Sequence, residues 1–551
     1  MRNILAGWLG VVLLASSAAG DAVTNEAAGP SAAPLAEGAV ADAETAAGQE
    51  DADQPAEAEV APALVDADPV ASADPPEPDA DPPPQEPTAD DVPTPVAPPA
   101  AAEVEAPGAA AVRVRVDLDV RGELFAPTGR DSPPVRQPIA VEARFDFTER
   151  REPARATTGR IYAEAKAVIR VDGLPQEVAL GADARRVEVA LQGTTPTPYL
   201  ADAFLTRDEA DLLDTPFDSL LLDRLLPADH VAIHDAWAIP ADAAAGMLAI
   251  DTIESGGLEA KLVAVEDGAA QVRLTGIVDG AVDGVPTHLA VEGDCTFTAE
   301  AAARDDAPAG WRLLAPRVVA VTIRERRQAG HVAPGLDVEA RVSVARHPLA
   351  ATADGAAPAV EPGDVDSIRR RGTGRPGLVW HDGRERGYDL VADARWRVVE
   401  DGPAGLVMRY VDRGALVGQC SLTVLPRGDA LAPATIAEVQ RDLERSLAGQ
   451  FGRFAHASEA TRSDGVRIVR VAAEGTAENR PFRWIHHVLT DARGRRAAVT
   501  FMLESAAEKR FGTADRELVD GLGFPAEPEA DRPGESPADR AARVPRETVT
   551  P

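Results

Sequence analysis

The stretch VRVRVDLDVRGEL (residues 112–124) alternates strictly between apolar and charged residues. Because successive side chains of a β-strand point to opposite faces, a period of two predicts a strand with one buried face and one wet face. A strand that keeps one polar face is typical of antiparallel sheets, since parallel strands are usually buried on both sides. The apolar positions are Val112, Val114, Val116, Leu118 and Val120.

The same alternation recurs over the following two hundred residues. It is found in PIAVEARFDFTER (138–150), RIYAEAKAVIRVDG (160–173), RVEVALQ (186–192), RVVAVTIRERR (317–327) and LDVEARVSVAR (336–346), and along 258–298. EDGA (266–269) and VDGAVDGV (278–285) carry the Asp-Gly pairs typical of tight hairpins. We therefore predict a large antiparallel sheet domain over 111–348.

A helical insertion interrupts this pattern between about residues 205 and 251. Thr206 with Glu209 three residues later predicts a capped helix start. DSLLLDRLLP (218–227) predicts a second short helix that Pro227 ends, and PADAAAGMLAID (240–251) a third. We expect these helices to cover one face of the sheet.

After a Gly-, Pro- and charge-rich linker (349–377), the order of elements changes. Short strands, a hairpin turning at 412–414, an amphipathic helix over 435–451, a four-stranded meander and a closing helix predict an α+β domain over 378–525. Leu518 and Leu522 are expected to pack inward from that last helix. The tail, 526–551, is expected to be disordered.

The N-terminus predicts export. Arg2 precedes an apolar run that ends in small residues near Gly20, the pattern of a signal peptide (1–20), and the run is too short for a stable membrane span. Residues 21–110 contain 21 Asp and Glu and no Lys or Arg, which predicts a disordered acidic spacer rich in Pro and Ala. The net charge of −34 therefore describes mainly this spacer, and no basic stripe favours nucleic acid.

HVAIHD (230–235) is the densest histidine and aspartate cluster of the chain, with Asp229 just before it. On a helix, His230 and His234 would share a face and could bind one zinc ion. Pro227 and the alternation of Val231 and Ile233 favour a strand instead. There the two histidines would lie ~13 Å apart, too far for one ion.

Other candidate side chains also favour structural roles. His486 and His487 are neighbours on a predicted strand and should face opposite sides, one toward a helix and one toward solvent. His331 precedes a Pro-Gly turn, Ser219 lies in a leucine-rich helix, and Cys295 and Cys420 lie in strands, where we expect buried free thiols. Ala163, Ala165 and Ala167 would share one strand face, where they either leave room for an apolar ligand or pack under a helix.

Two family resemblances follow from these patterns. The element order over 386–525, with RFGTADRELVDGLGF (510–524), resembles the PsbP-like α/β/α sandwich domains, which implies a non-enzymatic accessory module. LLDRLLP (221–227) followed by VAIHDAW (231–237) resembles exported bacterial β-rich domains of unknown function. In that resemblance His234 stands where glycine is usual, in a turn before Trp237.

Together these observations predict an exported, non-enzymatic protein of the periplasm or the extracellular space. We assign no catalytic, cofactor-binding or metal-ligating residue and expect no cofactor. The expected function is protein–protein interaction or assembly with an envelope partner. The alternatives are a carrier of an apolar ligand such as lipid and, less favoured, a metal-dependent hydrolase.

Overall fold

The computed structural model describes residues 111–126, 133–151, 157–302, 310–328, 334–349, 372–428 and 434–525. The predicted signal peptide, acidic spacer and tail, and most of the predicted linker, lie outside these residues. The described residues belong to one compact unit. They form a twelve-stranded, a seven-stranded and a four-stranded sheet. None of the helices described here is long and apolar enough to cross a membrane.

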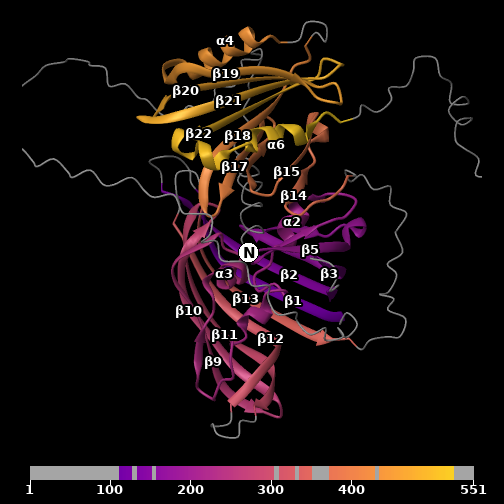
Figure 1. The fold of residues 1–551 in the computed structure, drawn as a ribbon, viewed down its shortest axis with the longest axis vertical. Coiled ribbons are helices and arrows are strands. Elements are labelled where there is room, and N and C mark those ends of the chain that lie inside the picture. Colours follow the sequence, from indigo (N-terminus) through magenta and orange to yellow (C-terminus); the bar gives the residue numbers. More distant parts are fainter. Residues whose placement is uncertain are drawn as a thin grey trace, which may run out of the picture. The chain divides into compact units, whose positions relative to one another are not determined.

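The large sheet is antiparallel, as its alternating sequence predicted, and is strongly curved (Figure 1). Its strands follow the order β6-β5-β3-β2-β1-β13-β12-β11-β10-β9-β8, with β4 beside β3. The first and last long strands, β1 and β13, therefore pair at its middle. The bounds are β1 Ala111–Ala126, β2 Val135–Arg151, β3 Thr157–Val171, β4 Leu174–Ala179, β5 Arg186–Gln192, β6 Thr195–Tyr199, β8 Ala236–Ala238, β9 Thr252–Glu266, β10 Ala269–Val282, β11 Val285–Ala302, β12 Gly310–Arg327 and β13 Gly335–Pro348.

One face of this sheet carries the hydrophobic core. Val114, Val116, Leu118 and Val120 of β1 are all buried, and they belong to one cluster with the apolar side chains of the other long strands. The insertion contributes α2 (Arg207–Leu213), η2 (Leu222–Leu225) and α3 (Ala241–Leu248) to the same cluster. The helices thus cover the apolar face, as expected, although the second of them is a single 3-10 turn.

Tight turns set the register of the hairpins. Asp172–Gly173, Asp267–Gly268, Asp283–Gly284 and Arg413–Gly414 each have two consecutive residues with positive φ. This backbone matches the twist of paired strands, and glycine adopts it without steric strain. The two Asp-Gly turns predicted from 266–269 and 278–285 are among them.

The alternation of β3 departs from the sequence prediction at Ala163. Asp146 and Phe147 of β2 pair with Glu164 and Tyr162, so Ala163 is an extra, unpaired residue. This β-bulge reverses the faces on either side of it. Ala165 and Ala167 are buried on the apolar face, which the insertion covers, whereas Ala163 is exposed. The predicted three-alanine face is therefore wrong at Ala163.

The seven-stranded sheet has the order β16-β17-β18-β22-β21-β20-β19 and is covered by helices on both faces (Figure 1). Its predicted hairpin, meander and helices are all present. The bounds are β16 Trp396–Gly402, β17 Gly405–Asp412, β18 Ala415–Leu425, α4 Ile436–Leu447, η4 Ala448–Gln450, β19 Phe451–Thr461, β20 Arg467–Ala477, β21 Arg480–Thr490, β22 Arg496–Glu504, η5 Ser505–Ala507, α5 Glu508–Phe511 and α6 Ala514–Gly521.

Each face of this sheet has its own core. Val439, Leu443 and Leu447 of α4 pack on one face. Leu518 and Leu522 are both buried in the cluster on the other face, as predicted, although α6 ends at Gly521, just before Leu522. Helices on both faces make this region α+β, in agreement with the coarse fold prediction.

The four-stranded sheet escaped the sequence prediction. It consists of β23 (Leu522–Gly523), β15 (Asp389–Asp393), β14 (Leu378–His381) and β7 (Leu205–Thr206), in that order. β7 pairs with β14 in parallel: Leu205 lies opposite Val379, and Thr206 lies opposite Trp380, so residues far apart in the sequence are neighbours in this sheet. A strand of two residues has no alternation to recognise, so the pattern could not reveal this sheet.

Candidate functional site

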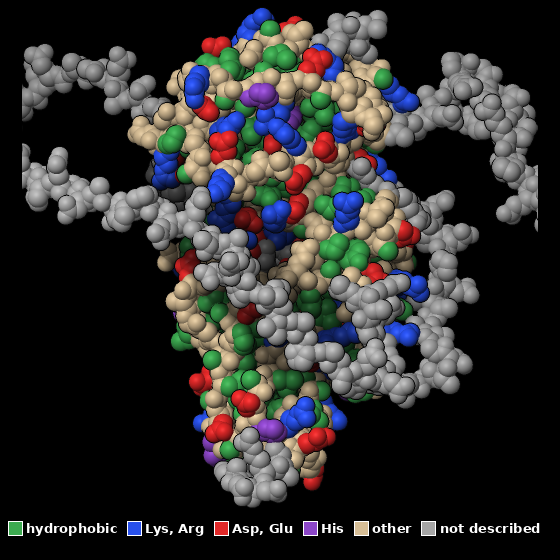
Figure 2. All heavy atoms as spheres, viewed as in Figure 1, with side chains coloured by type: hydrophobic (Ala, Val, Ile, Leu, Met, Phe, Trp, Pro, Cys, Tyr) green, Lys and Arg blue, Asp and Glu red, His purple; other side chains and the backbone are tan. Residues whose placement is uncertain are grey.

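The polar face of the large sheet is ordered in rows, because the strands pair without a register shift through its centre. One row contains Asp294, Ala320, Ser343, Asp117, Arg144 and Lys166; the next contains Glu292, Thr322, Arg341, Asp119, Glu142 and Val168. Both rows contain acidic and basic side chains. Figure 2 shows positive and negative side chains intermixed over the face of the molecule in view.

These two rows line a depression of about 660 Å³. Ala320 and Ser343 lie opposite each other, and their short side chains leave room between longer neighbours. The walls carry three carboxylates and three cationic side chains: Asp117, Asp119, Glu142, Arg144, Lys166 and Arg341. A neutral but highly charged surface of this kind suits a partner with a complementary charge pattern better than it suits an apolar ligand.

A second depression, of about 390 Å³, lies on the same face. It is lined by one histidine, three arginines and two acids: His288, Arg121, Arg324, Arg326, Asp337 and Glu339, with Ala290 and Val338. Arg324 donates to Glu339, and Arg326 forms an ion pair with Asp337 at 3.3 Å. We name this second depression the His288 hollow.

His288 is held by a short chain of hydrogen bonds. Its Nδ1 lies 2.7 Å from Asp279 Oδ1, and Ser255 Oγ donates to Asp279 Oδ2 at 3.1 Å. The hydrogen bonds from His288 and Ser255 lower the pKa of Asp279. Because a carboxylate only accepts, the proton sits on Nδ1, and Nε2 is the atom left to meet a ligand.

Sequence reasoning missed His288, although a signal was present. The turn predicted at Asp283–Gly284 fixes the pairing of every residue on its two strands, and it places His288 opposite Asp279. Counting outward from the turn would therefore have found this pair. The alternation alone assigned His288 only to a strand.

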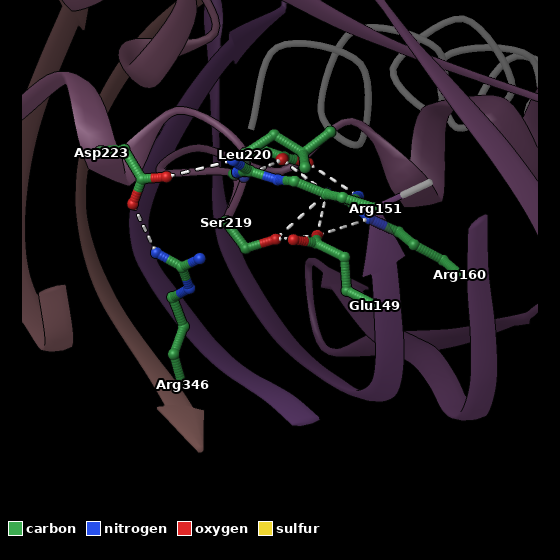
Figure 3. Close-up of polar contacts among 8 residues, drawn as sticks. Glu149, Arg151, Arg160, Ser219, Leu220, Asp223 and Arg346 are labelled. Atoms are coloured by element: carbon green, nitrogen blue, oxygen red, sulfur yellow. Dashed lines mark hydrogen bonds and ion pairs between the residues drawn. The ribbon is translucent and has the colours of Figure 1, made fainter. Parts of the chain in front are cut away.

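A buried polar cluster lies on the opposite, apolar face of the sheet (Figure 3). Arg160 donates to Glu149 from Nε at 3.1 Å and to Asp218 from both terminal nitrogens, at 2.8 and 2.6 Å. Ser219 donates to Glu149. Glu149, Arg160 and Ser219 are at most 3% exposed. Burial would lower the pKa of Arg160, but the charges of Asp218 and Glu149, together with Tyr162, keep it raised.

The bulge at Ala163 explains why an arginine points inward. Without it, Arg160 would lie on the same face as Lys166, in water; the extra residue turns Arg160 and Tyr162 toward the core. Asp218 and Ser219 come from the insertion, so the cluster fastens the insertion to β2 and β3. Next to it, Asp223 binds Arg151 at 3.2 Å and Arg346 at 2.8 Å (Figure 3).

This arrangement holds the insertion in place and offers no nucleophile for catalysis. Ser219 is 1% exposed, and its hydroxyl donates to a carboxylate instead of to a histidine. Activation of serine requires an adjacent base that can take its proton and access for a substrate. The interpretation of Ser219 as a core residue agrees with this geometry.

The histidines of HVAIHD do not form a site together. His230 and His234 are both exposed, Val231 makes a single bridge to Trp311, and His234 has φ +79° in a turn. Asp235 accepts from the backbone of Ala232, and β8 follows directly. Trp237 then donates to the carbonyl of Leu225 at 2.9 Å. His234, which stands where glycine is usual in the resembling domains, has the positive φ that glycine adopts without strain.

His486 and His487 point to opposite faces of β21. His487 is buried, with Nε2 3.0 Å from Asp515, and Arg470 donates to the same carboxylate oxygen at 2.8 Å. His486 is half-buried instead of solvent-facing, and its Nδ1 lies 2.8 Å from Thr500 Oγ1. Burial lowers the pKa of His486 to about 4.

The remaining candidates offer no chemistry within the described chain. Cys295 and Cys420 are buried free thiols, and burial raises the pKa of Cys295 to about 12 and that of Cys420 further. Among the residues described, no group of three or more His, Cys, Asp or Glu could hold a metal ion. His331 lies outside the described residues.

Comparison with known proteins places no family name on this chain. No family model matches it, and no curated protein matches it. Among solved structures, cyanobacterial PsbP (CyanoP) from Synechocystis sp. PCC 6803 is 17% identical, with a TM-score of 0.22 over 27% of this chain and 93% of that one. A lipovitellin structure titled for its lipid–protein interactions is 8% identical, with a TM-score of 0.22 over 43% of this chain and 25% of that one.

The PsbP structure is therefore a neighbour of a small part of the chain. The match to lipovitellin spans only about a quarter of that protein's length. At these TM-scores neither likeness carries an argument about function.

Proposed function

We propose that this protein is an exported, non-enzymatic interaction or assembly module of the bacterial envelope, and that it binds a partner protein through the 660 Å³ depression of its large sheet. The observation that carries the proposal is the contrast between the two faces of that sheet. The apolar face is core, whereas the polar face presents a depression walled by six charged side chains. Export rests on the sequence of residues 1–20.

The chemistry of the described side chains supports a binding role over catalysis. The thiols are buried and their pKa values are raised, which keeps them protonated at neutral pH. Ser219 is locked in an internal cluster. A charged depression also favours a protein partner over an apolar ligand, because binding an apolar group there would desolvate charges without replacing their hydrogen bonds.

Site-specific photo-crosslinking in the native cells tests this proposal. A photoreactive residue at Ser343, inside the depression, should give one discrete adduct with a partner protein. The same residue at Thr275, exposed on β10 of the same face outside the depression, should give none. Reversing two walls with R144E and R341E should abolish the Ser343 adduct. Identical adducts from both positions, or none from Ser343, would contradict the proposal.

Native mass spectrometry of the purified full-length protein separates this function from carriage of an apolar ligand. An interaction module should give the mass of the polypeptide alone. Co-purified lipid that survives in the gas phase at a fixed stoichiometry would favour the carrier instead.

A further inference from the structure

The His288 hollow combines an oriented histidine with a concentration of guanidinium groups. Three arginines and His288 line it, and Asp119, Asp279, Asp337 and Glu339 hold their side chains in place. Arg326 lies directly opposite His288 on the neighbouring strand, and Arg324 lies opposite Ala290, whose short side chain leaves space beside it.

We propose that the His288 hollow binds one oxyanion group, a phosphate or a carboxylate, between His288 and the arginines Arg324 and Arg326. This site lies outside the 660 Å³ depression, and the proposal does not depend on whether a partner protein binds to that depression. Guanidinium groups recognise phosphate and carboxylate through paired, charge-assisted hydrogen bonds.

The arginines retain donors for such a ligand. The hydrogen bond from Arg324 to Glu339 and the ion pair of Arg326 with Asp337 both use Nε. Arg324 meets Glu292 only at 3.6 Å, beyond hydrogen-bond distance. Within the described part of the chain, the terminal nitrogens of both side chains are therefore available, and both side chains are more than 60% exposed.

His288 contributes an oriented ring nitrogen to the hollow. Asp279, supported by Ser255, fixes the ring so that Nε2 is the atom exposed to the hollow. Neutral Nε2 carries a lone pair that repels an oxyanion, whereas protonated Nε2 donates to it. The charged groups around the ring are Asp279 on β10, Arg324 and Arg326 on β12, Asp337 and Glu339 on β13, and Arg121 on β1.

Sulfate binding to the full-length protein tests the site. Equilibrium dialysis with radiolabelled sulfate should show saturable binding to the wild type. H288Q and R326Q should each weaken this binding. H347Q, which alters an exposed histidine on β13 away from the hollow, should leave binding unchanged.

Competition identifies the source of the oxyanion. Phenyl phosphate displacing sulfate better than N-acetylglutamate assigns a phosphate ligand, and the reverse order assigns a carboxylate. The absence of saturable sulfate binding up to about 50 mM, or binding that neither H288Q nor R326Q alters, would overturn the proposal.

Discussion

At the scale of single residues, arginine–carboxylate ion pairs contribute differently to the stability of this protein depending on whether they are exposed or buried. On the polar face, Arg113 binds Asp146 with both side chains in contact with water. On the apolar face, Arg160 binds Glu149 and Asp218 with all three buried. Exposed pairs contribute little because water and salt screen them, whereas a buried pair that loses one partner leaves a charge without solvation. The first prediction follows from this contrast.

R160M should lower the free energy of unfolding by about 3–5 kcal/mol, because Glu149 and Asp218 would be left as buried, unpaired carboxylates. Urea denaturation followed by circular dichroism measures this change. R113M, on β1 of the same sheet, is the matched control, and it should lower the free energy of unfolding by less than about 1 kcal/mol.

Removing the partners together tests the cause. In the triple variant R160M/E149Q/D218N no buried charge remains, so much of the lost stability should return. A triple variant no more stable than R160M would show that the methionine disturbs packing and that the charges are not responsible.

At the scale of elements, alternation predicted the strands and their buried faces, but it could not predict where the alternation breaks. The residues around Ala163 read as continuous alternation, and only the pairing of Phe147 with Tyr162 shows the extra residue. Because that bulge turns Arg160 inward, the polar cluster was invisible in the sequence. The capping box at Thr206 was predictable, since Thr206 and Glu209 exchange hydrogen bonds within one helical turn.

The turn at His234 gives an element-scale prediction. His234 has φ +79°, a conformation that is strained for a residue with a side chain, and it is exposed. H234G should raise the free energy of unfolding by about 0.5–1 kcal/mol, and H234V should lower it by about 1–2 kcal/mol. Thermal denaturation with and without a chelator measures both. Equal destabilisation by H234G and H234V would contradict a role in the turn.

At the scale of the whole molecule, the sequence did not predict contacts between segments that lie far apart in the chain. β7 and β14 pair across the chain through strands of two and four residues, too short to show a period. The net charge of −34 also gave no guide to the folded surface, because 21 acidic residues lie in residues 21–110. The rows of acidic and basic side chains on the polar face became visible only with the register of five strand pairs.

Buried histidines predict how stability responds to mild acid. His381 is 8% exposed, and burial, together with Arg207, lowers its pKa to about 3 from 6.5. The unfolded chain therefore takes up a proton near pH 6.5 while the folded chain does not, so stability falls as the pH drops from about 6.5 toward 3. By pH 5 the loss from this residue should be about 2 kcal/mol.

H381Q removes the titrating group and should flatten this part of the stability curve between pH 7 and 5, as measured by urea denaturation at each pH. H347Q is the control, because His347 is exposed. A curve for H381Q that is parallel to that of the wild type would refute the assignment.

Asp515 predicts a second loss of stability at lower pH, caused by protonation of a carboxylate in the folded protein. The pKa of its carboxyl is about 2, because hydrogen bonds from His487 and Arg470 outweigh the opposing effect of burial. A carboxyl with a lowered pKa stabilises the fold above its unfolded value of 3.8, and this stability, about 2 kcal/mol, is lost as the pH falls from about 4 through 2. D515N should therefore be less stable than the wild type at pH 6 and should approach it near pH 2. H381Q should alter stability only in the upper pH range and D515N only in the lower one, so the two variants separate the transitions. A difference in the free energy of unfolding between D515N and the wild type that stays constant from pH 6 to 2 would instead attribute the effect of D515N to lost packing.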